Sequence, residues 1–179
     1  MTDFLIIVGS TREGRRSIHA AEEVDTVLQE QGHQTTLFDL KEKEIPFLGN
    51  RSYTDEEPVP EDIQELSQLV QDSDGIMIIS PEYNHSIPGV LKNALDYLYP
   101  EYSDKPFSYV TTSAGGFGGV RALGHLQDIT LALGGFPGPS VQISDIGSVF
   151  EDGELVDKET RERVEQFADK ADQHVRKLN

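Results

Sequence analysis

Short apolar runs alternate with amphipathic segments along this chain, and this alternation constrains the fold more than any other feature. Five runs have the length and composition of buried strands, at residues 4–8, 35–40, 75–80, 107–112 and 140–143. Apolar residues recur at helical spacing between and after them, at residues 17–31, 60–70, 87–98, 120–133 and 157–178. Strands interleaved with helices predict a parallel, doubly wound α/β sheet with helices on both faces, a three-layer sandwich.

Local signals mark several ends of these elements. Gly32 follows the first helix, Pro60 opens the second, and Asp157 stands where the last helix would be capped. Residues 41–59 are polar and bounded by proline, which predicts a long irregular loop of the kind that is often functional or mobile.

The chain has 179 residues and no cysteine. This length fits a single domain, residues 1–179, that buries a core without disulfides. The lack of cysteine excludes disulfides, thiol redox chemistry and cysteine-ligated metals. The five histidines do not have the spacing of metal ligands on one helical face, so we expect no metal site. Any redox chemistry therefore needs a bound cofactor.

Acidic residues outnumber Lys and Arg by 32 to 15, and the formal net charge is −17. Nucleic acids and anionic membranes need clustered basic residues, so neither is expected as a partner. The acidic residues are spread along the chain, which fits either a solubilising surface or adaptation to high salt. Because no apolar run approaches a membrane span and the first residues lack a basic signal-peptide start, we expect a cytoplasmic protein.

The segment 81–98, PEYNHSIPGVLKNALDYL, says most about function. It leads from the end of a buried strand through a polar loop into a helix, and open α/β sheets bind ligands at such strand ends. PEYN, with SIPG and LKNA behind it, closely resembles the signature of the NADPH-dependent FMN reductase family. These are flavodoxin-like flavoenzymes that include quinone, azo-dye and chromate reductases. The resemblance implies the strand order 2-1-3-4-5, with the ligand between the first and third strands.

The loop after the first strand, residues 9–17, holds three of the chain's 15 basic residues. Hydroxyls, glycine backbone and a helix N-terminus suit a phosphate, although the glycines could be plain turn residues and the arginines solvated surface. The glycine spacing is near that of a P-loop, but Arg15 and Arg16 stand where that motif needs Lys and then Ser or Thr. A Rossmann fingerprint fails because Thr11 takes the place of its second glycine.

The resemblance instead implies an FMN phosphate loop. It assigns phosphate binding to Ser10, Arg12 and Ser17. Arg15 and Arg16 extend the same set, in a loop longer than that of commoner family members.

The resemblance also implies that Pro81, Glu82, Tyr83 and Asn84 hold the isoalloxazine ring, largely through backbone groups. Judged from the residues alone, Glu82 could be a catalytic acid and Tyr83 a stacking platform or a core aromatic. Ordinary structural roles are equally open for both side chains. His85 is expected to be exposed at the tip of the loop.

A glycine-rich loop, residues 113–119, follows the fourth strand. Glycines permit positive φ and close approach of the backbone to a flat ligand. The family resemblance implies that Ser113, Gly115, Gly116 and Gly119 line the flavin edge. Arg121 could contact a pyridine-nucleotide phosphate or form a salt bridge on the helix surface.

These features predict an FMN-dependent oxidoreductase with NADPH or NADH as donor, no catalytic side chain, and a small-molecule electron acceptor: a quinone, azo compound, chromate or free flavin. The alternatives are an electron-transfer flavodoxin, disfavoured by the arginines, and a phosphate-ester hydrolase or kinase, disfavoured by the defective P-loop and the lack of a nucleophile–base pair in the sequence.

An aromatic cluster at residues 97–102 and the family resemblance both predict a homodimer or homotetramer. The alternative is that this cluster packs against the loop at residues 41–59.

Overall fold

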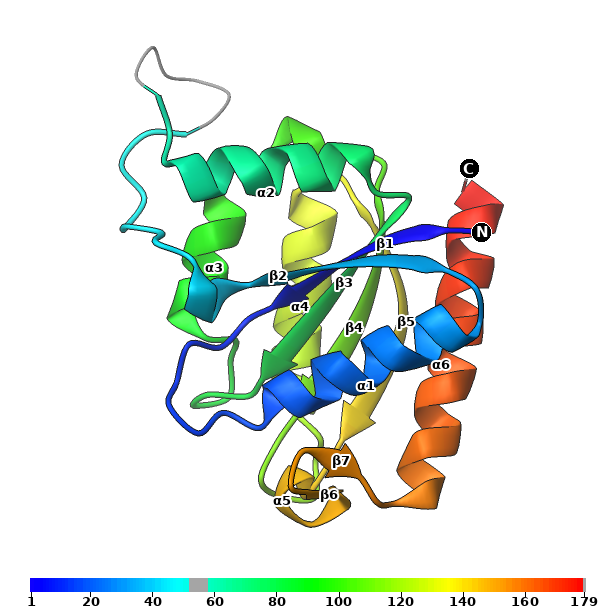
Figure 1. Ribbon diagram of the computed structural model, residues 1–179. Coiled ribbons are helices and arrows are strands. Elements are labelled where there is room, and N and C mark those ends of the chain that lie inside the picture. The colour runs from blue at the N-terminus through cyan, green and yellow to red at the C-terminus, as the bar shows by residue number, and fades with distance from the viewer. Residues whose placement is uncertain (52–57, 179) are drawn as a thin grey trace.

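The computed structural model describes residues 1–51 and 58–178. A five-stranded parallel sheet runs in the order β2-β1-β3-β4-β5, which confirms the predicted topology (Figure 1). Its strands are β1 (Asp3–Val8), β2 (Gln34–Asp39), β3 (Gly75–Pro81), β4 (Pro106–Thr112) and β5 (Phe136–Ile143). The helices are α1 (Ser17–Glu30), α2 (Glu61–Asp72), α3 (Gly89–Asp96), α4 (Val120–Ala132), α5 (Ile146–Val149) and α6 (Lys158–Leu178). The described elements also include two 3₁₀ turns, Leu40–Glu42 and Pro100–Tyr102. Strands β6 (Phe150–Glu151) and β7 (Glu154–Leu155) form a small antiparallel hairpin.

Helices cover both faces of the sheet and give the molecule three layers (Figure 1). Side chains of β1 alternate between the two faces because successive residues of a strand point in opposite directions. Leu5 and Ile7 join a core with α2, α3 and α4, whereas Phe4, Ile6 and Val8 join a second core with α1 and α6. Burial on both faces explains why the central strands are almost continuously apolar.

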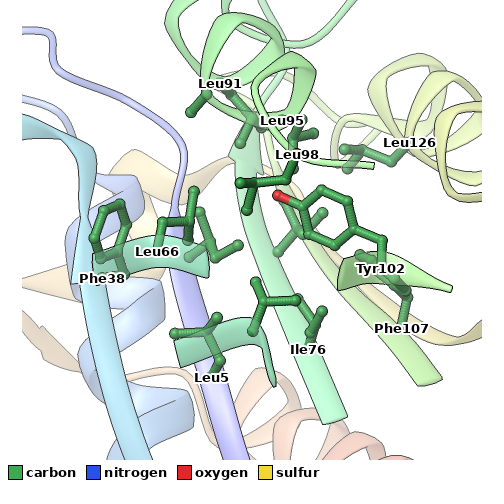
Figure 2. Packing of buried hydrophobic residues seen from close by; sticks show 14 of the residues in the cluster. Leu5, Phe38, Leu66, Ile76, Leu91, Leu95, Leu98, Tyr102, Phe107 and Leu126 are labelled. Carbon is green, nitrogen blue, oxygen red and sulfur yellow. The ribbon is translucent and has the colours of Figure 1, made fainter. Parts of the chain in front are cut away.

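The core on the α2, α3 and α4 side contains most of the predicted aromatic cluster (Figure 2). Tyr97, Leu98 and Tyr102 are at most 1% exposed within the single chain, and Tyr99 alone of the cluster's tyrosines is substantially exposed. The Tyr97 hydroxyl donates to the carbonyl oxygens of Pro46 and Phe47. The cluster thus packs in the core and against the described part of the loop after β2, so it is no argument for an oligomer.

Several boundaries differ from the sequence prediction. Strand β5 begins at Phe136, four residues before the predicted start, and continues through a stretch rich in proline and glycine. Such residues argue against a central strand, but they are tolerated at a sheet edge, where β5 lies. Helix α3 begins at Gly89, after Pro88, and ends at Asp96. The β6–β7 hairpin was not predicted, and part of the predicted loop, residues 52–57, lies outside the described residues.

The predicted end signals of the first and last helices are confirmed. The Asp157 carboxylate accepts the backbone N–H of Thr160 at 2.8 Å, and hydrogen bonding from Thr160 lowers the pKa of this carboxyl. Gly32 follows α1 with a φ of 84°, the left-handed conformation that glycine adopts without strain. Within the described residues, no helix combines the length and the apolar character needed to cross a membrane.

Two buried tyrosines provide a stability test. The fully buried Tyr102 hydroxyl has no hydrogen-bond partner among the described residues, and burial raises its pKa far above the usual value. The Tyr109 hydroxyl instead donates to Thr130 at 2.8 Å. We expect Tyr102→Phe to raise the free energy of unfolding by about 1–2 kcal/mol and Tyr109→Phe to lower it by a similar amount, because only the second change leaves a buried polar group unpaired.

Urea unfolding of the two variants and the parent chain measures both changes. Equal destabilisation by the two substitutions would show that the Tyr102 hydroxyl is hydrogen-bonded in solution.

Candidate functional site

The loops after β1, β3 and β4 meet at the carboxyl edge of the sheet (Figure 1). Together they line an open cavity of about 340 Å³. Its walls are formed by Arg12, Gly14, Arg15, Arg16, Ser17, Pro81, Glu82, Tyr83, Thr112, Ser113, Ala114 and Ile146. Eight of the predicted site residues are among them. The other five are Ser10, Asn84, Gly115, Gly116 and Gly119, which lie in the same three loops but outside the walls.

Gly9 allows the first loop to leave the sheet close to α3. Its N–H donates to the carbonyl oxygen of Ile79 at 2.8 Å, so the loop starts directly beside β3. A Cβ atom at this position would lie 2.7 Å from a Leu91 side-chain carbon, too close for any other residue without a shift. Glycine therefore places the end of β1 and the start of its loop at the switch point between β1 and β3.

The polar groups around Ser17 are suited to an anion. Ser17 is 2% exposed, its Oγ has no hydrogen-bond partner among the described residues, and it lines the cavity at the start of α1. Helix α1 has no side-chain cap and no acidic residue in its first turn, so its partial positive charge is not offset there. Arg12 and Arg16 also line the cavity, and neither guanidinium forms a hydrogen bond or ion pair within residues 1–51 and 58–178. A buried hydroxyl, a helix N-terminus and two unpaired arginines fit a phosphate group.

Arg15 is arranged differently from its two neighbours. Its guanidinium donates to both carboxylate oxygens of Asp39, at the end of β2, and to the carbonyl oxygen of Ser10. The side chains are 8% and 16% exposed, so this is a largely buried ion pair. Although Arg15 touches the cavity, its charge is already matched by Asp39, and the side chain braces the first loop against β2.

The second loop is a tight hairpin turn. Tyr83 and Ser86 exchange backbone hydrogen bonds, and both residues between them have positive φ, 50° for Asn84 and 64° for His85. Asn and His are among the residues most often found in this conformation, which explains the residue types at the tip. His85 is exposed there, as predicted. The Tyr83 hydroxyl lies 2.7 Å from Ser10 Oγ, so the second loop is hydrogen-bonded to the first.

Glu82 joins the second loop to α4, the helix that follows the third loop. Its carboxylate accepts the backbone N–H of Arg121 at 3.1 Å, in the first turn of α4, where a negative charge is favourable. Arg121 Nη1 lies 3.6 Å from the same carboxylate, so the arginine forms the surface salt bridge that was one of its two predicted roles. This arrangement favours a structural role for Glu82 over that of a catalytic acid.

The glycine loop supports the site mainly through its backbone. Gly119 has a φ of 81° immediately before α4, and a Cβ there would lie 3.0 Å from Thr111. Ser113 Oγ donates to the Gly115 carbonyl oxygen at 2.6 Å. The Ser113 carbonyl in turn accepts the N–H of Ile146 at 3.1 Å. The loop is thereby held next to α5, whose Ile146 side chain lines the cavity.

Sequence reasoning missed Gly14, Thr112, Ala114 and Ile146 as wall residues. The first three adjoin predicted residues and could have been found by extending the loops by one position. Ile146 had no such signal, because α5 is a four-residue helix that follows β5 and was not predicted.

The Arg15–Asp39 pair predicts a large effect on stability. Asp39→Ala should lower the free energy of unfolding by about 3–5 kcal/mol, because it leaves a buried guanidinium without a counter-charge. Asp96→Ala is a suitable contrast. It breaks an exposed ion pair with Lys92 and should cost about 0.5 kcal/mol or less.

Urea unfolding of both variants tests this prediction, together with the double variant Arg15→Met/Asp39→Leu, which should recover much of the loss. Similar small losses for Asp39→Ala and Asp96→Ala would mean that the Arg15–Asp39 pair is solvated.

Comparisons with known proteins identify the family of this chain. The family model for NADPH-dependent FMN reductase matches residues 2–147, which include all three loops. The chain is 34% identical over 119 residues to a 2-hydroxy-1,4-benzoquinone reductase of a Burkholderia species, covering 62% of this chain and 65% of the relative. It is 35% identical over 126 residues to an NAD(P)H-dependent FMN reductase of Pseudomonas aeruginosa, covering 66% and 68%. The match thus spans just under two thirds of the length of the Burkholderia relative.

The fold is also that of a solved flavoenzyme. FerB, an NAD(P)H:(acceptor) oxidoreductase from Paracoccus denitrificans, superposes with a TM-score of 0.76 at 24% identity, covering 97% of this chain and 99% of that one. The family match, the strand order and the three loops lead to one conclusion: this chain belongs to the NADPH-dependent FMN reductase family.

Proposed function

We propose that this protein is an FMN-dependent NAD(P)H oxidoreductase that passes hydride from nicotinamide, by way of the flavin, to a small acceptor such as a quinone, azo compound, chromate or free flavin. The observation that carries the proposal is the Ser17 hydroxyl at the N-terminus of α1, which is buried, has no hydrogen-bond partner among the described residues, and lies in a cavity that Arg12 and Arg16 also line. The relatives' names, NAD(P)H-dependent FMN reductase and 2-hydroxy-1,4-benzoquinone reductase, support this class of donor and acceptor.

In this proposal Ser17, Arg12 and Arg16 bind the FMN phosphate, and Ser10 and Arg15 hold the loop in shape. The remaining predicted residues, which form or support the ring site, are Pro81, Glu82, Tyr83, Asn84, Ser113, Gly115, Gly116 and Gly119. When bound, FMN supplies the redox chemistry, and the protein supplies binding, orientation and electrostatics. The Glu82 carboxylate accepts a hydrogen bond from the first turn of α4, so Glu82 is not assigned as an acid or base. No other side chain is assigned such a role.

An electron-transfer flavodoxin remains the alternative function. A flavodoxin has no substrate of its own, so rapid bleaching of the flavin spectrum by NADPH, without another protein, separates the two proposals. The lack of bleaching by either NADPH or NADH would favour the flavodoxin.

We also propose a homodimer or homotetramer. Most of the aromatic cluster is buried in the single chain, so this proposal rests on the family resemblance alone. The molar mass in solution, measured by light scattering, tests it.

The phosphate assignment predicts that Arg12→Ala weakens FMN binding by about 1.5–3 kcal/mol, the range for a charge-assisted hydrogen bond. Arg176→Ala is the matched control. It removes the same charge from the exposed end of α6, where Arg176 pairs with Asp172, and should leave FMN binding unchanged. Titrations of the apoproteins with FMN, FAD and riboflavin measure the effect, and FMN should bind best.

Equal affinity for the three flavins, or equal effects of Arg12→Ala and Arg176→Ala, would remove the first loop from the phosphate site.

The acidic surface leads to a prediction about salt. We propose that the net charge of −17 reflects adaptation to high salt, so self-repulsion should lower stability at low ionic strength. Raising KCl from about 0.1 M to about 2 M shortens the Debye length and should raise the melting temperature of the apoprotein. Thermal unfolding over this KCl series is the measurement, and a flat series would show that the charge only aids solubility.

A further inference from the structure

Four arginines lie in or beside the cavity, and two of them are already neutralised by the protein. Arg15 is paired with Asp39 in a largely buried contact. Arg121 lies 3.6 Å from the Glu82 carboxylate, and its guanidinium carbon is 5.5 Å from the centre of the Phe117 ring. Each of these two positive charges is therefore offset by a carboxylate of the protein, for Arg15 in a largely buried pair and for Arg121 at the surface, where its side chain is 44% exposed.

The two unpaired arginines belong to the proposed phosphate site. Arg12 and Arg16 line the cavity together with Ser17, whose hydroxyl has no hydrogen-bond partner within residues 1–51 and 58–178. A bound phosphate monoester carries close to two negative charges at neutral pH, which matches these two guanidinium groups. Once the phosphate is bound, no unpaired arginine is left among the described residues that line the cavity.

The loops around the cavity add negative charge. Glu13 in the first loop has a side chain that is 91% exposed, although its carboxylate also contacts Lys41. Asp145 is exposed beside the glycine loop, with Oδ2 close to Gly116. The chain as a whole has a net charge of −17. We therefore expect an anion that approaches the loaded site to be repelled by this excess of negative charge, because every arginine of the described cavity wall then has a counter-charge.

We infer that this site selects uncharged electron acceptors over anionic ones, with Glu82 as a specificity-determining residue because it neutralises Arg121. The inference rests on the proposed function. Quinones without ionised groups are favoured, whereas chromate and quinones and azo dyes with a sulfonate on the reacting ring system are disfavoured. Pyridine nucleotides differ from these acceptors because their charges lie on phosphates several bonds away from the reacting ring.

The test measures binding without turnover. Oxidised protein loaded with FMN is dialysed to equilibrium at pH 8, without any reductant, against 1,4-naphthoquinone or 1,4-naphthoquinone-2-sulfonate. Between about 0.05 M and about 0.5 M KCl, the Kd of the sulfonate should fall by about threefold to tenfold as repulsion is screened. The Kd of the neutral quinone, which controls for other effects of salt, should change by less than about twofold.

Two variants that each remove one negative charge separate the effect of charge at the site from the effect of the net charge of the chain. Glu82→Gln removes the partner of Arg121, so at low salt it should improve sulfonate binding, relative to the neutral quinone, by about threefold or more. Asp169→Asn removes the same charge from an exposed position on α6 and should change this ratio by less than about 1.5-fold.

Stopped-flow reoxidation of the reduced, FMN-loaded protein by the same two quinones gives a second readout. The rate constant for the sulfonate should rise with KCl, and that for the neutral quinone should not.

The failures of the two proposals are distinguishable. A protein that retains no flavin absorbance after reconstitution overturns the proposed function and this inference with it. An FMN-loaded protein whose Kd values for both quinones respond equally to KCl overturns the inference alone. Equal ratios for Glu82→Gln and Asp169→Asn would overturn the role of Glu82.

Discussion

Burial of the sheet on both faces is the constraint on which the rest of this structure depends. Helices cover β1, β3 and β4 on both sides, so the connecting backbone reaches solvent only at the two ends of the strands. All five strands are parallel, and their carboxyl ends therefore lie along one edge. The order β2-β1-β3 sends the connections after β1 and β3 to opposite faces, and the opening between them is where such sheets bind ligands.

Polar contacts between loops then fix the shape of that opening. Ser10 and Tyr83 join the first loop to the second, and Glu82 joins the second to α4. The Arg15–Asp39 pair holds the first loop against the end of β2. Each contact links residues distant in sequence, so the three loops form one preorganised site, and preorganisation of this kind lowers the entropy lost on binding.

Charge is distributed unevenly between the site and the rest of the molecule. In a chain with 32 acidic and 15 basic residues, the first loop alone contributes three arginines. These arginines differ in their contacts within the protein. Arg15 pairs with Asp39 and holds the first loop, whereas the Arg12 and Arg16 side chains have no partner in the described part of the chain and line the cavity together with Ser17. The proposed phosphate site thus places two positive charges in a protein whose net charge is −17.

The sequence by itself determined the fold class, the strand order by way of the family resemblance, and the three loops that form the site. It could do so because the apolar period of each element and motifs such as PEYN are local patterns. Only the tertiary structure decided which side chains are free to act. The Asp39 that neutralises Arg15 is 24 residues away, the Arg121 that holds Glu82 is 39 residues away, and Ile146 comes from a helix too short to predict. Tyr97 and Tyr102 were likewise predicted at an interface but lie in the core, because the sequence shows that a residue is apolar and not which surface covers it.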